Sequence, residues 1–122
     1  MPESDTPSVA RSSLSGATIA ESVRQRSESA AVVLDQALAA ISARDAELNC
    51  FTALATDRAR QRAAQIDNAI AAGKDPGPLA GVPFAVKNLF DIARVTTLAG
   101  AKINQDHPPA SQDASAITRL ER

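Results

Sequence analysis

The chain has 122 residues and a formal net charge of -1, so it has no excess of positive charge for binding nucleic acid or an anionic membrane surface. Its length suits a single domain. The hydrophobic fraction of 44% overstates the core, because 26 residues are alanine, as many as leucine, isoleucine, valine and phenylalanine together.

Three features indicate a soluble, cytoplasmic protein with no membrane partner. No apolar run approaches the ~18 residues of a membrane span. The first 16 residues, MPESDTPSVARSSLSG, lack the apolar core of a signal peptide. Cys50 is the single cysteine, so it cannot form an intrachain disulfide, and we interpret it as a small packing residue rather than a reactive thiol.

The chain is predicted to begin with disorder and continue with helices. Residues 1–16 are rich in serine and proline and are expected to be disordered. Thr18 and Glu21 have the spacing of a capping box, which predicts a short helix from Thr18 to about Gln25. Ser27 is the predicted cap of a second helix. Apolar residues with helical spacing predict its buried face: Ala30, Val33, Leu34, Ala37, Leu38 and Ile41.

A third helix completes the predicted helical segment of residues 17–73. Residues 48–54 are read as an extended connection that leads into it. The helix is expected over about 55–72, with one face formed by Ala59, Ala63, Ile66 and Ile70. Gly73 is expected to end it, because glycine adopts the left-handed conformation at no steric cost.

Residues 74–122 have a different pattern, which predicts an α/β fold class for the chain. Residues 74–78 form a turn-rich linker, and the apolar run 82–86 is typical of a strand covered on both faces. Asp113 is the predicted cap of a last helix through Ile117 and Leu120. The chain stops at Arg122, within that predicted helix, so we expect a truncated protein.

One segment carries a specific motif. Residues 78–92, PLAGVPFAVKNLFDI, closely resemble the segment that identifies the amidase-signature family, with its G-[IV]-P-x-x-V-K core. TTLAGAKI at 96–103 and DASAITRL at 113–120 are similar to the family's next two blocks. The resemblance implies that residues 74–122 are the start of a mixed-sheet core, with its first strand and helix, which is incomplete in this chain.

The resemblance assigns a catalytic role to Lys87. In the family the matching lysine is the base of a Ser-cis-Ser-Lys triad and accepts a proton through the bridging serine, so that the second serine attacks an amide carbonyl. A lysine must be neutral to act as a base, and burial favours the neutral form. A lysine that ends an apolar strand is well placed for burial, although without the motif such a lysine usually extends into water.

Other polar residues near the motif have simpler interpretations. Asn88 reads more readily as a turn residue than as a support for Lys87. His107 is read as a solvated loop residue, and Ser111, Ser115 and Thr118 as caps or surface residues. Arg94 stands where the family commonly has glycine, so a positive φ at that position would strain the loop after Lys87.

The resemblance also implies a function for the parent protein. The sequence of these motif blocks is most similar to that of the carboxybiuret hydrolase subunit group, which cleaves small urea-derived amides. The alternative group is the corresponding subunit of the glutamyl-tRNA(Gln) amidotransferase, and both groups work with a small helical partner subunit. No cofactor or metal is expected. Both catalytic serines are absent, so the chain alone is predicted to be inactive. A non-catalytic helical interaction module, or a non-functional product, remains as an alternative.

Overall fold

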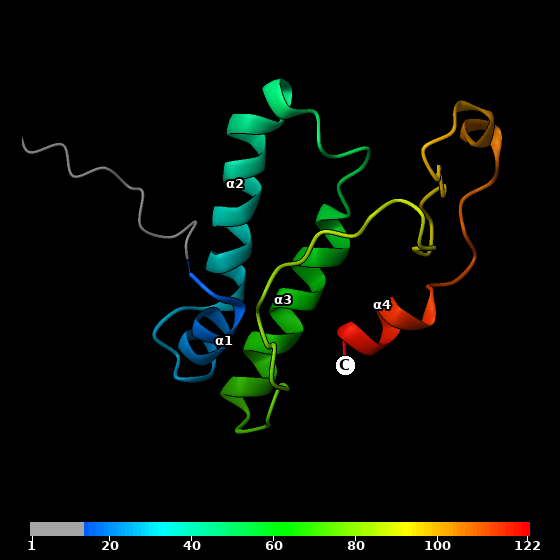
Figure 1. Cartoon of the computed structure of the whole chain (residues 1–122). Coiled ribbons are helices and arrows are strands. Elements are labelled where there is room, and N and C mark those ends of the chain that lie inside the picture. Colours follow the sequence, from blue (N-terminus) through cyan, green and yellow to red (C-terminus); the bar gives the residue numbers. More distant parts are fainter. Residues whose placement is uncertain (1–13) are drawn as a thin grey trace, which may run out of the picture. The chain divides into compact units, whose positions relative to one another are not determined.

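The computed structural model describes residues 14–122, which form five helical elements (Figure 1). These are α1 (Gly16–Arg24), α2 (Ala30–Leu48), α3 (Thr56–Ala71), η1 (Lys102–Asp106) and α4 (Ser115–Leu120). Residues 1–13, most of the segment predicted to be disordered, lie outside the described residues. Residues 14–39 and 57–83 make up a first unit, and residues 40–56 and 84–122 make up a second unit, so the division falls within α2.

The first unit has a small apolar core between helices. The buried residues Val23, Ala30, Val33 and Ala63 form its centre, and Ile19, Leu34, Ile66 and Ile70 pack against them. Within this unit α3 runs antiparallel to the first half of α2 (Figure 1). Alanine on the facing surfaces allows helix backbones to approach closely, which suits the alanine-rich composition.

The helical periodicity predicted the buried faces correctly. Every residue predicted for the apolar faces of α2 and α3 is buried or half-buried. The end of α3 is also as predicted, because Gly73 follows it with a φ of 72°. These features depend on spacings of three and four residues, which is why the sequence pattern was sufficient.

The predicted caps were displaced by a few residues. Ser15, rather than Thr18, is the N-cap of α1, and its Oγ accepts a hydrogen bond from the Thr18 N–H at 3.2 Å. Glu21 does not complete a capping box, because its carboxylate bonds to Arg24 and Gln25 instead. At α2 the cap is not Ser27: Ser29 Oγ accepts from the Val32 N–H at 3.1 Å.

A carboxylate from α3 provides a second cap for α2. Asp67 Oδ1 accepts from the Ala30 N–H at 2.8 Å, and Oδ2 accepts from the Ala31 N–H at 3.1 Å. These N–H groups belong to the first turn, where no intrahelical acceptor exists and where negative charge is favoured. Asp67 therefore joins two helices of the first unit, a contact that the apolar spacing of α3 did not indicate.

Replacing Asp67 by alanine is expected to destabilise the chain by about 1–2 kcal/mol, because two helix-end N–H groups lose their acceptors. Asp67→Asn keeps one acceptor oxygen and should cost less. Asp35→Ala is the matched control: it removes an ion pair with Arg60 whose side chains are both 57% exposed, and such pairs contribute about 0–1 kcal/mol. Urea unfolding followed by circular dichroism measures all three. Equal losses for Asp67→Ala and Asp35→Ala would contradict the capping role.

Gly81, in the turn near the end of the first unit, packs closely against the buried side chain of Val23. Gly81 has a φ of 76°, and a Cβ added there would lie 2.7 Å from Cγ2 of Val23. Val23 is 1% exposed, and Ala80, next to the glycine, is 4% exposed. The glycine of the G-V-P motif thus has a packing reason as well as a backbone reason in this structure.

The second unit contains no strand among its described residues, which corrects the prediction for residues 82–86. That segment, which straddles the boundary between the units, is irregular and makes no ladder hydrogen bonds. A strand requires a neighbouring strand to receive its N–H and C=O groups, and no part of residues 14–122 forms one. The described part of the chain is therefore helical and irregular rather than α/β.

Several polar contacts connect the loop segments of the second unit to one another. Asp113 does not cap α4, whose N-cap is Ala114 without a side-chain bond; its Oδ1 accepts from the Ala93 N–H at 2.8 Å. Asp91 accepts from the Thr97 hydroxyl at 2.5 Å through its side chain and from the Ala114 N–H at 2.8 Å through its carbonyl. These bonds tie residues 91–97 to the start of α4.

Candidate functional site

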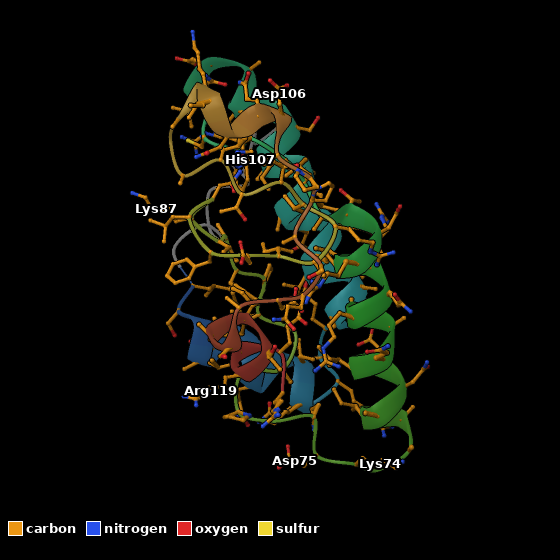
Figure 2. The ribbon with its side chains drawn as sticks, turned by 90° about the vertical axis from the view of Figure 1, so that its right-hand side faces the viewer. Lys74, Asp75, Lys87, Asp106, His107 and Arg119 are labelled. Carbon is orange, nitrogen blue, oxygen red and sulfur yellow. The ribbon has the colours of Figure 1, made fainter. Side chains whose placement is uncertain are left out.

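Lys87 ends the irregular segment 82–87, and its side chain is exposed. Figure 2 shows it projecting outward from the ribbon. Within residues 14–122 its ammonium group makes no hydrogen bond or ion pair. The burial expected of a strand-end lysine is therefore not found. Residues 82–86 form no strand, because no neighbouring strand exists among the described residues.

The backbone after Lys87 is folded into a tight turn. The Lys87 carbonyl accepts from the Leu89 N–H at 2.8 Å and from the Phe90 N–H at 3.2 Å. Asn88 is the second residue of this turn and is half-buried. The direction in which the chain leaves Lys87 is thus set by hydrogen bonds to Lys87 itself.

Asn88 attaches this turn to two other segments of the second unit. Its Nδ2 donates to Thr52 Oγ1 at 3.0 Å, and its Oδ1 accepts from the Leu98 N–H at 3.1 Å. Its carbonyl accepts from the Ala99 N–H at 2.8 Å. The structure therefore brings together Lys87, Asn88, Thr52 and the 98–99 turn. Sequence reasoning had not connected Thr52 to this site, because the contact spans 36 positions.

Arg94 has the positive φ that the family glycine would accept freely. Its φ is 70°, and its N–H donates to the Ala110 carbonyl at 2.8 Å. A non-glycine residue in this region is strained by about 1–2 kcal/mol. The strain foreseen for the loop after Lys87 is therefore present, and the loop keeps its hydrogen bonds in spite of it.

Arg94→Gly is expected to raise the free energy of unfolding by up to about 1 kcal/mol, because relief of the left-handed strain exceeds the entropy that glycine adds to the unfolded chain. Ala93→Gly, at the adjacent position where φ is not positive, should lower it by about 0.5–1 kcal/mol. Chemical denaturation of the two variants measures both signs. A destabilised Arg94→Gly protein would mean that the arginine side chain matters more than the backbone angle.

The remaining polar candidates are not gathered around Lys87. Cys50 is free and exposed, so its predicted packing role was wrong; its N–H donates to Asp45 at 2.6 Å beyond the end of α2. His107 is an exposed loop residue, as predicted, and its carbonyl accepts from the Thr96 hydroxyl.

Residues 14–122 contain no group of three or more side chains suited to hold a metal ion. None of their helices combines the length and apolarity that crossing a membrane requires.

Comparison with protein families gives one match, to the family described as amidase, over residues 32–122. AtzE, a 1-carboxybiuret hydrolase subunit of Pseudomonas sp. (strain ADP), is 50% identical over 102 residues, which are 84% of this chain and 22% of that protein. A glutamyl-tRNA(Gln) amidotransferase subunit of Bdellovibrio bacteriovorus is 42% identical over 104 residues, 85% of this chain and 21% of that protein. The chain thus spans about a fifth of the length of these curated relatives.

Solved structures match the chain closely. Two structures of a vestigial protein complex, described as revealing the evolutionary origins of an s-triazine catabolic enzyme, superpose with TM-scores of 0.86 and 0.87. The first of them contains an inhibitor. In both, the identity is 47%, and the match covers 88% of this chain and 24% of the solved chain.

Proposed function

The chain belongs to the amidase family, and on that premise we propose that it is the N-terminal part of a hydrolase that cleaves the C–N bond of a small, urea-derived linear amide. The observation that carries the proposal is the 78–92 motif with Lys87 at its centre. The 50% identity to a 1-carboxybiuret hydrolase subunit supports the choice of substrate class, with carboxybiuret as the first candidate.

In the proposed mechanism Lys87 is the catalytic base. Lys87 takes a proton through a bridging serine while a second serine attacks the amide carbonyl. The tetrahedral intermediate then breaks its C–N bond as the same proton passes to the nitrogen, so that ammonia leaves and an acyl-serine remains. Water hydrolyses this ester and frees the serine. Both serines would come from sequence that follows the matched segment in the longer relatives. In that context residues 82–86 would gain strand neighbours, which would provide the burial that Lys87 lacks here.

A partner protein is part of this proposal. The relative AtzE is named as one subunit of its enzyme, and the superposed structures are described as a complex. We propose a small helical protein as the partner and the cytoplasm as the location, the latter on the sequence features given above. The second candidate function is that of a glutamyl-tRNA(Gln) amidotransferase component, which the 42% identity to such a protein favours.

A chimera tests the proposal. The full 122-residue chain replaces the segment of the Pseudomonas AtzE protein that aligns with it, and the product is expressed with that relative's own companion subunits. The chimera is expected to release ammonia from carboxybiuret, whereas the 122-residue chain alone should not. A parallel chimera in the Bdellovibrio amidotransferase tests the second candidate. If only the amidotransferase chimera is active, the proposed carboxybiuret hydrolase function is rejected in favour of the second candidate.

A further inference from the structure

Asn88, the residue that follows Lys87, makes three polar contacts. One end of its side-chain amide holds Thr52 and the other end holds the Leu98 N–H, while its carbonyl holds the Ala99 N–H. The two side-chain bonds measure 3.0 and 3.1 Å. An amide is suited to this position because it offers a donor and an acceptor on opposite sides.

These contacts act on the backbone of Lys87. Asn88 lies inside the turn closed by the Lys87 carbonyl, so the peptide that joins the two residues is held both by that turn and by the Asn88 side chain. Thr52 lies in the connection between α2 and α3, and Leu98 lies in the loop before η1. Anchorage at two separate segments fixes a position in space better than one bond does, because rotation about a single bond remains free.

We propose that Asn88 is a positioning residue for Lys87: it holds the lysine backbone at the place from which its amine reaches the bridging serine. This inference rests on the proposed function. It reverses the sequence interpretation, which preferred a simple turn residue. Such positioning matters for catalysis because proton transfer is sensitive to geometry: a catalytic group misplaced by about 1 Å can lower the rate about 100-fold.

The choice of variants follows from the atoms. Asn88→Leu has a similar size but removes both side-chain bonds and leaves the Leu98 N–H without its acceptor. Asn88→Asp keeps an acceptor for Leu98 and can accept from the Thr52 hydroxyl in place of donating to it. Thr52→Val removes only the Thr52 anchor, in a residue that is exposed.

Asn104→Leu is the matched control. Asn104 Nδ2 donates to the Leu98 carbonyl at 2.8 Å, so this change removes a side-chain bond to the same loop without touching the residue next to Lys87. It should lower stability to a similar extent as Asn88→Leu. Its kcat should remain within about twofold of the parent, because the geometry at Lys87 is retained.

The experiment measures kcat and KM of these variants in the AtzE chimera, with Lys87→Ala beside them. Asn88→Leu is expected to lower kcat by about 10- to 100-fold with little change in KM, Thr52→Val by a smaller factor, and Asn88→Asp to stay near the parent value. Amide hydrogen exchange of Leu98 in the 122-residue chain should become faster in Asn88→Leu and not in Asn88→Asp.

Each outcome separates the positioning role from the proposed function. A chimera that keeps its activity in Lys87→Ala overturns the proposed function itself. A chimera that is inactive in Lys87→Ala but fully active in Asn88→Leu overturns only the positioning role. Should Asn88→Leu fail to fold, Thr52→Val decides: a reduced kcat with normal folding supports the inference, and an unchanged kcat overturns it. An equal fall of kcat in Asn104→Leu would also overturn it.

Discussion

Replacing Lys87 by alanine in the AtzE chimera is expected to lower kcat for carboxybiuret by about 10²- to 10⁴-fold, the range typical for loss of a general base. The effect should fall on kcat rather than KM, because the proposed proton transfer occurs in the transition state. In the 122-residue chain the same substitution should leave folding unaffected, since the Lys87 side chain is exposed there and makes no polar contact within residues 14–122. Ammonia release under saturating substrate measures the change.

Lys87→Arg distinguishes a base from a fixed positive charge. Arginine is always protonated in proteins, so it cannot accept the proton and should be as inactive as alanine. Lys74→Ala is the control, because Lys74 is also an exposed lysine in the 122-residue chain and carries no proposed role. Substantial activity in Lys87→Arg would contradict the base assignment and indicate an electrostatic role for the charge.

Replacing Gly81 by alanine is expected to give a large loss of folding stability, about 2–5 kcal/mol. Two terms contribute: the left-handed backbone at φ 76° costs a non-glycine residue about 1–2 kcal/mol, and forcing a methyl group into a packed site typically costs about 1–3 kcal/mol. The added Cβ would approach Val23 Cγ2 to 2.7 Å and Cγ1 to 3.0 Å. The clash is with a buried side chain that has little room to move.

Gly73 separates these two terms. Its φ of 72° is nearly the same, but a Cβ added there meets nothing within 4 Å. Gly73→Ala should therefore show only the backbone cost, and its difference from Gly81→Ala measures the steric clash with Val23. Urea unfolding at constant m-value provides both numbers. Equal losses in the two variants would mean that the first unit relaxes around Val23 without cost.

The caps show where local pattern reading is insufficient. Thr18, Ser27 and Asp113 all have suitable side chains at suitable spacings, yet Ser15, Ser29 and Ala114 stand at the cap positions instead. Several neighbouring residues could cap each helix start, and the difference between them is about 1 kcal/mol or less. At α2 a distant residue contributes as well: Asp67 accepts from the Ala30 and Ala31 N–H groups, and a local sequence window does not contain that residue.

The sequence by itself determined the first three helices, the buried faces of α2 and α3, the end of α3 at Gly73 and membership of the amidase family. Helical spacing and a contiguous motif are local properties, so they are visible without a fold. Only the tertiary structure decided that Asp67 caps a helix 37 positions away, that Asn88 reaches Thr52, and that residues 82–86 form no strand. Each of these depends on which distant segment lies beside the residue, and that is settled when the chain packs, not by the spacing of its side chains.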